Sequence, residues 1–315
     1  MTPIGIVIPT FNGERFLAET LRSVQSQSVG DWECVIVDDG SADGSTAIAS
    51  QFTSVDERFR LVRQPNAGVS AARNRGFREL SETPRYIVFL DQDDVWLPNT
   101  LEALSLELDR HPGAVGAHGL CDTIDESGVR TGEEFTENGR RRLGYDGLAL
   151  APRDPALPTA FETLLYANAV CPPGLLLARR EFYDRVGPWD VNFAAVQDWD
   201  MCIRLSRHGE VRYVDRVVIL YRRHARSGSR DGLRNIVEIR RLYHKTFFSP
   251  ENDERQQKLV RDGWRALQVY RMREKIARAH AEIRSGRLAA GTMMLGHVAV
   301  HAIRLVRGYP TARGV

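Results

Sequence analysis

Three aspartates within four residues follow an apolar run in the first third of the chain. The run is Tyr86 to Leu90, and it ends at Asp91, Asp93 and Asp94. Carboxylates this close repel one another unless a cation holds them. Oxygen ligands select Mg²⁺ or Mn²⁺, which keep waters and bridge to substrate phosphates. The spacing therefore predicts a divalent-metal site, with a solvated acidic turn as the alternative.

A second acidic cluster follows another apolar segment. Trp32 to Val37 reads as a strand, and Asp38, Asp39, Gly40 and Ser41 come directly after it. If both strands are parallel neighbours, their carboxyl ends meet at one edge, so Asp39 is expected beside Asp91 and Asp93. A carboxylate there can accept from a base N–H or a ribose hydroxyl. By itself this segment would be an ordinary Asp-Gly turn.

Two further segments carry polar side chains near predicted helix starts. Pro9 to Glu14 follows the first apolar run, where a dinucleotide enzyme would carry G-x-G-x-x-G. That fingerprint is absent, which disfavours a Rossmann dehydrogenase; Asn12 can instead cap a helix. Pro65 to Gly68 forms a tight turn before a helix containing Arg73, which can approach a phosphate or lie on the surface.

The elements that must position these residues alternate between strand and helix. We expect an α/β fold with a mostly parallel central sheet and ligands beyond the carboxyl ends of its strands. The expected strands are 4–8, 32–37, 59–62, 86–90, 114–117, 211–214 and 217–221. Residues 121–159 lack periodicity and read as a long loop over the site.

Charge divides the chain into two parts. The 315 residues are 43% hydrophobic with a net charge of +2, but residues 231–315 carry about +9, which leaves about −7 before them. The acidic part suits a metal site and disfavours a nucleic-acid groove. The basic, helix-prone tail suits contact with an anionic membrane surface, or else forms a solvated helical face. Its apolar stretch Leu288 to Ile303 falls short of the ~20 residues that span a bilayer.

Cysteine usage and the first residues predict a cytoplasmic protein that is, at most, peripheral on the inner membrane face. Cys34, Cys121, Cys171 and Cys202 are scattered without a C-x-x-C pair, which argues against a zinc site or a disulfide framework. The chain enters an apolar strand at Ile4 with no recognisable export signal.

Taken together, the four polar segments resemble glycosyltransferase family 2, whose fold is called GT-A. The resemblance covers about Pro3 to Ser229. It depends on Pro9-Thr10-Phe11-Asn12, Val37-Asp38-Asp39-Gly40-Ser41, Asn66-x-Gly68 with Ala72-Arg73-Asn74-x-Gly76, and Asp91-x-Asp93-Asp94. Each segment is weak alone, but all four occur in order at predicted strand ends.

The resemblance implies a nucleotide-diphospho-sugar donor and roles for individual residues. Asp39 would contact the base, Asp91 would lie near the ribose or diphosphate, and Asp93 would bind Mn²⁺ or Mg²⁺ directly. The implied nucleotide-sugar contacts are Pro9, Thr10, Phe11, Glu14, Asp39, Asn66, Arg73, Asp91 and Asp93.

The resemblance also implies an acceptor side. Gln197-Asp198-Trp199 matches the family's acceptor segment, in which Asp198 would be the general base and Gln197 replaces the usual Glu. Gln197 and Trp199 would contact the acceptor. Tyr221-Arg222-Arg223-His224, with Ser227 and Ser229, resembles the closing strand and loop, so His224 is expected to join Asp93 at the metal. An inverting transfer needs one base, and the metal stabilises the leaving diphosphate.

These observations predict an inverting glycosyltransferase that uses a nucleotide sugar, UDP-linked by family habit. The acceptor would be a saccharide or lipid-linked saccharide of a cell-surface polysaccharide or glycolipid. We expect a catalytic domain at 1–230, with a donor half at 1–118 and an acceptor half at 119–230, followed by a basic helical extension at 231–315. A sugar-phosphate nucleotidyltransferase or a non-catalytic nucleotide- or carbohydrate-binding module is the alternative.

Overall fold

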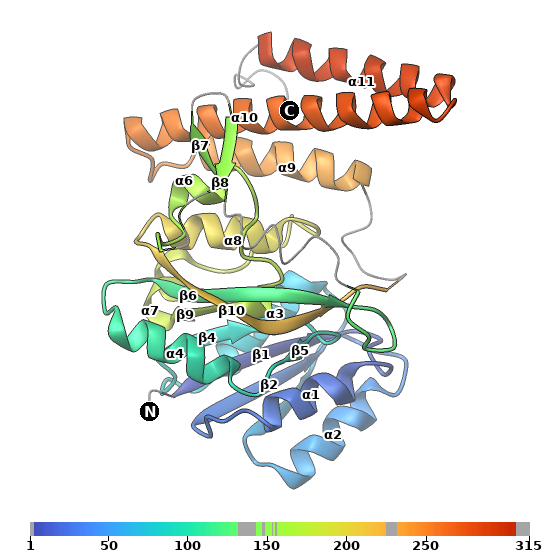
Figure 1. The fold of residues 1–315 in the computed structure, drawn as a ribbon. Helices are drawn as coiled ribbons and strands as arrows, with labels where there is room; N and C mark the ends of the chain where they lie inside the picture. The colour runs from blue at the N-terminus through green and yellow to red at the C-terminus, as the bar shows by residue number, and fades with distance from the viewer. Residues whose placement is uncertain are drawn as a thin grey trace.

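The computed structural model describes residues 3–131, 143–146, 149–152, 154, 156–224 and 232–306. Figure 1 shows strands surrounded by helices, with the last helices stacked above them. The strands are β1 Ile4–Thr10, β2 Trp32–Asp38, β3 Phe59–Arg63, β4 Tyr86–Phe89, β5 Val95–Trp96, β6 Gly116–Ile124, β7 Leu143–Asp146, β8 Ala149–Pro152, β9 Leu176–Arg179 and β10 Val211–Arg222. The helices are α1 Leu17–Gln25, α2 Ser45–Val55, α3 Val69–Glu79, α4 Thr100–Arg110, α6 Phe161–Leu164, α7 Arg180–Val186, α8 Gln197–Ser206, α9 Gly232–Phe247, α10 Glu254–Arg284 and α11 Leu288–Val306, with a 3₁₀ turn η1 at Pro173–Leu175.

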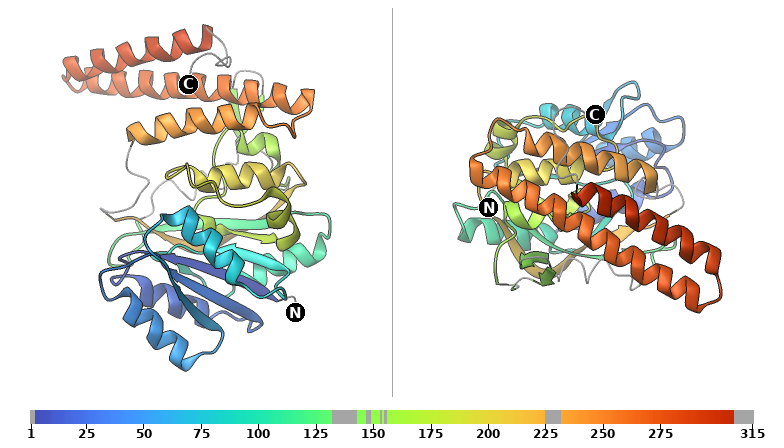
Figure 2. Two further views of the ribbon diagram at one scale, coloured as in Figure 1. Left: turned by 180° about the vertical axis from the view of Figure 1, so that it is seen from behind. Right: turned by 90° about the horizontal axis from the view of Figure 1, so that it is seen from above.

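Within the described ranges, the main sheet has eight strands in the order β3-β2-β1-β4-β9-β6-β10-β5. Its first four strands are parallel, with β1 between β2 and β4. The chain steps from β1 outward to β3 and then returns to β4. Right-handed crossovers therefore place α1 and α2 on one face and α3 on the other, as Figures 1 and 2 show.

The other half of the sheet is mixed. Strand β9 runs antiparallel to both β4 and β6, and β5 runs antiparallel to β10. Three predicted strands need correction. The strand expected at 114–117 begins only at Gly116 and continues to Ile124 as β6, and the pair expected at 211–214 and 217–221 is the single strand β10. Its pairing with β6 shifts register between Tyr213 and Val217, an irregularity that separates the two apolar runs in the sequence.

The core lies around the parallel strands. Every residue of β1 is buried, as expected for a strand covered by helices on both faces. Each fully buried Ile, Val or Leu stabilises the fold by about 1.5–3 kcal/mol. Helix α3 lies close to β1 because it presents Ala72 and Gly76: a Cβ at Gly76 would lie 2.3 Å from Val7 Cγ1. This fixes the helix that carries Arg73 against the strand before Thr10.

Residues 121–159 are more structured than the sequence indicates. Strand β6 continues to Ile124, and β7 pairs with β8 as an antiparallel hairpin. Within this predicted loop, residues 132–142, 147–148, 153 and 155 lie outside the described residues.

The first of the C-terminal helices, α9, packs against α8. Helix α9 buries Leu242 and Tyr243, and the Tyr243 ring meets Trp199 of α8 edge to face at 6.2 Å. Helices α10 and α11 form an antiparallel pair above it (Figures 1 and 2). No helix in the described part of the chain is both long and apolar enough to cross a bilayer. The proposed boundary at 230 lies outside the described residues.

Candidate active site

The predicted donor segments meet at the carboxyl edge of the parallel strands. The turn after β2 is bonded to β1, because Asp39 N donates to Thr10 O at 2.8 Å. The turn after β4 is bonded to the same loop, because Phe11 N donates to Gln92 Oε1 at 2.9 Å. These bonds follow from the strand order, in which β1 lies between β2 and β4. The structure therefore brings Thr10, Asp39 and Asp91 to one edge.

The loop after β1 is held by the loop after β2. Asn12 has a positive φ of 48°, donates from its N–H to Ser41 Oγ at 3.0 Å, and accepts from Ala42 N at 2.9 Å through Oδ1. It is not a helix cap, because α1 begins only at Leu17. Glu14 likewise accepts from Gly44 N at 2.7 Å. Phe11 is an exposed apolar side chain of the same loop.

Asp39 organises the segment that contains Asn66. Its buried carboxylate accepts from Gln64 Nε2 at 2.7 Å, Ala67 N at 2.9 Å and Gly68 N at 2.8 Å. A carboxylate has about four acceptor positions, so these three bonds leave room for one more donor. Gly68 has a φ of 89°, a conformation that side chains rarely adopt, at the start of α3.

Arg73 contacts both Asp91 and the later part of the chain. Its side chain is 1% exposed, and Nη2 lies 2.6 Å from Asp91 Oδ1. Its guanidinium also stacks over the Trp189 ring at 4.5 Å, while Nε and Nη1 have no hydrogen-bond partner among the described atoms. Loss of water contact raises the pKa of Asp91, and the charges of Asp93 and Asp198 raise it further. The positive charge of Arg73 lowers the pKa and partly offsets this rise. Arg73 is thus placed to orient Asp91.

Asp93 and His224 come together from segments far apart in sequence. His224 Nε2 lies 2.8 Å from Asp93 Oδ2, and both side chains are partly exposed. No group of three or more potential metal-binding His, Cys, Asp or Glu residues occurs within the described ranges. A carboxylate beside an imidazole nevertheless suits a divalent cation that takes its other ligands from water and diphosphate. The residues present fit such a cation.

The turn after β4 that carries Asp93 is held by Arg222, a role that the sequence did not indicate. This buried side chain donates from Nε to Asp93 O at 3.0 Å and from Nη2 to Glu19 at 2.6 Å. Its backbone N–H donates to Asp94 Oδ1 at 3.0 Å. Burial raises the pKa of Asp94, and the charges of Asp93 and Asp91 add to this effect. Asp94 is therefore part of the support beneath the turn.

On the acceptor side, Asp198 lies in the first turn of α8 and is buried. Asn168 Nδ2 donates to its Oδ2 at 2.9 Å, and Trp199 N donates to its Oδ1 at 2.8 Å. Sequence reasoning missed Asn168, whose single amide has no local pattern. The charge of Asp198 adds to the raised pKa of Asp91, so the two carboxylates lie near enough for their charges to interact.

The two predicted acceptor contacts, Gln197 and Trp199, differ in how deeply their side chains are buried. Gln197 is half-buried, and its Oε1 has no partner among the described atoms, so it can accept from a ligand. Trp199 is buried, donates from its indole to Leu164 O, and packs against Tyr243. The ring of Trp199 thus belongs to the core beneath α9, and its contact with the acceptor stays a prediction.

Comparison with known proteins identifies the class. Residues 5–185 match the profile described as Glycosyl transferase family 2, and the chain belongs to that family. Among curated relatives, the Mycobacterium tuberculosis "PGL/p-HBAD biosynthesis glycosyltransferase" is 28% identical over 69% of this chain and 75% of its own length. The Bacillus subtilis "Minor teichoic acid biosynthesis protein GgaA" is 37% identical over 32% of this chain and 23% of its own length. The chain thus spans well under two thirds of GgaA, as it does of the Streptococcus pneumoniae "Glycosyltransferase GlyA", where it covers 13%.

Solved structures confirm the predicted GT-A fold. Residues 1–349 of S. aureus TarS in complex with UDP-GlcNAc superpose with a TM-score of 0.64 at 13% identity, over 93% of this chain and 90% of that one. The mannosyltransferase PcManGT from Pyrobaculum calidifontis, in complex with GDP-Man and Mn²⁺, gives 0.61 at 15% identity, over 96% and 81%. Family membership favours the glycosyltransferase prediction over the nucleotidyltransferase alternative.

Proposed function

We propose that this chain is an inverting glycosyltransferase that moves a sugar from a nucleoside diphosphate to an acceptor hydroxyl. One observation carries the proposal: a buried aspartate on α8, Asp198, lies near enough to Asp91 at the carboxyl edge of the parallel strands for their charges to interact. An inverting transfer requires this arrangement, with a base on one side of the sugar and a diphosphate site on the other.

On the donor side, Asp39 accepts from the nucleotide base through its remaining acceptor position, and Asp91 lies by the ribose or diphosphate. Asp93 and His224 hold Mn²⁺ or Mg²⁺, which stabilises charge on the departing diphosphate when it is bound. The remaining donor contacts proposed are Pro9, Thr10, Phe11, Glu14, Asn66 and Arg73.

On the acceptor side, Asp198 takes the proton from the acceptor hydroxyl. The oxygen of that hydroxyl attacks the anomeric carbon as the diphosphate departs. Asn168 keeps one carboxylate oxygen oriented, and Gln197 accepts from the acceptor. Since Asn168 and the Trp199 N–H each hold a different oxygen of Asp198, the carboxylate is fixed before the acceptor binds.

The donor is a UDP-sugar, and the acceptor is a saccharide or lipid-linked saccharide of a cell-surface polysaccharide or glycolipid. The named relatives and the UDP-GlcNAc complex of TarS support this choice, and the acidic first 230 residues argue against a nucleic-acid partner.

Donor turnover tests the proposal. The protein is incubated with UDP-GlcNAc, other UDP-sugars or GDP-mannose, with Mn²⁺, Mg²⁺ or a chelator, and release of the nucleoside diphosphate is measured. We expect release from at least one donor, lost on chelation. Release that persists with chelator would exclude the metal role, and no release from any donor, with or without saccharide acceptors, would contradict the proposed reaction.

We also propose a cytoplasmic protein that contacts the anionic inner face of the membrane through α10 and α11. Leu288, Met293 and Leu295 are exposed on α11, and α10 is rich in Arg and Lys. In sedimentation with vesicles, more protein should be found in the pellet with anionic lipid than with neutral lipid. Equal recovery in both supernatants would contradict the contact.

A further inference from the structure

The loop before α8 is held by α9, although the two segments are far apart in sequence. Glu238 is buried, and its carboxylate accepts from two consecutive backbone N–H groups: Ala194 N at 3.0 Å and Ala195 N at 2.6 Å. Hydrogen bonds to a charged acceptor are about twice as strong as neutral ones. Because α8 begins at Gln197, Glu238 fixes the backbone just before the turn that carries Asp198.

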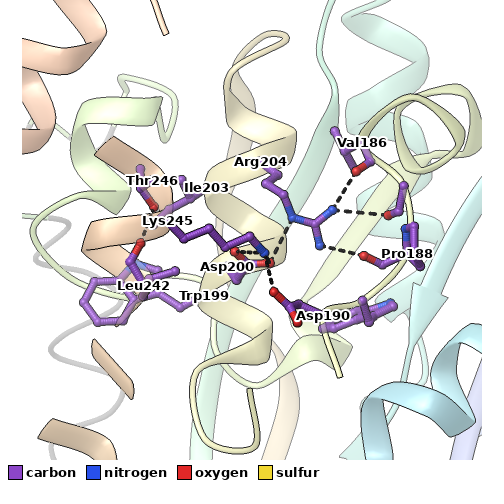
Figure 3. Close-up of polar contacts among 12 residues, drawn as sticks. Val186, Pro188, Asp190, Trp199, Asp200, Ile203, Arg204, Leu242, Lys245 and Thr246 are labelled. Carbon is purple, nitrogen blue, oxygen red and sulfur yellow. Dashed lines mark hydrogen bonds and ion pairs between the residues drawn. The ribbon is translucent and has the colours of Figure 1, made fainter. Parts of the chain in front are cut away.

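Lys245 lies two turns further along α9 and pairs both with the loop before α8 and with α8 itself. Its Nζ lies 2.8 Å from Asp190 Oδ2 on the loop, and 2.8 and 2.9 Å from the two oxygens of Asp200 on α8, as Figure 3 shows. Asp200 is 3% exposed, so removing a cation beside it would leave a buried carboxylate with fewer partners. Burial opposes ionisation of Asp190, but the bonds from Lys245 and Asn192 outweigh it and hold the pKa of Asp190 below its usual value.

Arg204 completes the support from within α8. It donates from Nε to Asp200 Oδ2 at 2.9 Å and from its other nitrogens to the carbonyl oxygens of Val186, Gly187 and Pro188 (Figure 3). Asp200 therefore lies between a cation of α8 and a cation of α9. Loss of Lys245 would leave Asp200 with Arg204 and release Asp190.

The far side of the loop touches the donor site. Asn74 forms two hydrogen bonds with the Trp189 backbone, at 2.8 and 2.9 Å, and Arg73 stacks on the Trp189 ring while binding Asp91. The loop at 187–196 is thus attached to the donor edge at Trp189 and to α9 at Ala194 and Ala195.

We infer that Glu238 and Lys245, here called the α9 clamp, are positioning residues for the catalytic base. They hold loop 187–196 and the start of α8 so that Asp198 faces the donor edge. This inference rests on the proposed role of Asp198 as base. It assigns the first helix of the C-terminal extension to the catalytic unit rather than to attachment alone.

Single substitutions in the 315-residue chain test the clamp. Lys245→Met removes the ammonium at similar length, Glu238→Gln removes the charge, and Lys245→Arg keeps a cation. Lys258→Met is the matched control, because Lys258 is exposed on α10 and pairs only locally with Asp262. For each variant we would measure nucleoside-diphosphate release from the preferred donor, UDP affinity by calorimetry, and hydrogen exchange at residues 187–200.

Misplacing a reacting group by about 1 Å can cost about 100-fold in rate. We expect Lys245→Met and Glu238→Gln to lower kcat about tenfold or more, with donor KM and UDP affinity within about twofold, and to speed exchange at Ala194, Ala195 and Asp198. Lys245→Arg should recover most of kcat, and Lys258→Met should match the wild type. Unchanged kcat in both clamp variants, or UDP affinity falling in parallel with kcat, would overturn the inference.

The two proposals fail in different ways. If the wild-type protein turns over no donor, the proposed function is at fault, and hydrogen exchange still decides on the clamp: unchanged protection of loop 187–196 in both variants overturns it. If Glu238→Gln does not fold, Lys245→Met decides by the same measurements.

Discussion

The donor side and the acceptor side of the site are built in different ways. On the donor side, Thr10 ends β1, Asp39 and Asp91 follow the parallel strands on either side of it, and the short loops bond to one another. On the acceptor side, Asp198 depends on Asn168 before it and on loop 187–196, which α9 holds from behind. Strand order therefore assembles the donor side, whereas long-range side-chain contacts assemble the acceptor side.

This difference predicts that substitutions will separate the two sides. Changes at the strand ends should affect donor and metal binding, and changes at α8 should affect turnover alone. Arg73 is the exception, because it contacts Asp91 on one side and Trp189 on the other.

The largest effect is expected at Asp198. Asp198→Asn keeps the shape but removes the base, and general-base catalysis contributes about 10²–10⁴-fold. We expect kcat for transfer to fall about 1,000-fold. The control is Asp184→Asn on α7, an exposed aspartate in a local ion pair with Arg180. Transfer within tenfold of the wild type would remove Asp198 from the role of base.

Asp93 should give the next largest effect. Asp93→Asn weakens the direct metal ligand and leaves His224 alone, so we expect turnover at fixed Mn²⁺ to fall about 100-fold and the half-saturating Mn²⁺ concentration to rise. A titration of rate against Mn²⁺ measures both. An unchanged Mn²⁺ dependence would separate Asp93 from the metal.

Arg73→Met should affect both sides moderately. It removes the counterion of a partly buried aspartate and the stacking on Trp189, so we expect UDP affinity and kcat each to fall about tenfold and the melting temperature to decrease. Arg75→Met, on the same helix in an exposed pair with Glu79, is the control. If UDP affinity alone or kcat alone changed, Arg73 would act only on the donor side or only on the acceptor side.

The smallest effect is expected at the opposite edge of the sheet, where neither side of the site is touched. Arg58 bonds to Asp56 before β3 and lowers the pKa of Asp56 to about 2. Since the folded-state pKa is depressed, the pair stabilises the fold above about pH 4, and this contribution is lost as pH falls through about 2. We expect Asp56→Asn to lower the free energy of unfolding by about 1 kcal/mol at pH 7 in urea titrations.

At pH 2 the variant and the wild type should differ little, and donor turnover at pH 7 should be unchanged. A stability difference that grows on acidification would contradict the assigned ion pair.

The same contrast explains what the sequence could predict. The aspartate turns were predicted because each lies directly after an apolar strand, and the parallel order of β1, β2 and β4 does the rest. The contact of His224 with Asp93 spans 131 residues and was predicted only through the family resemblance. The contact is confirmed, and its metal role stays a prediction.

The misses have tertiary causes. Asn12 resembles a helix cap locally, but its partners Ser41 and Ala42 lie on the next loop. Glu238 and Lys245 follow no local pattern that indicates their partners, because those partners lie 43 to 55 residues earlier in the chain.

Calorimetric titration of UDP with Mn²⁺ into the wild type, Asp93→Asn and Asp198→Asn tests the division between the two sides most directly. We expect Asp93→Asn to lose at least tenfold in Mn²⁺-dependent UDP affinity, while Asp198→Asn binds UDP within about twofold of the wild type. Equal losses in both variants, or a loss in Asp198→Asn alone, would contradict this division.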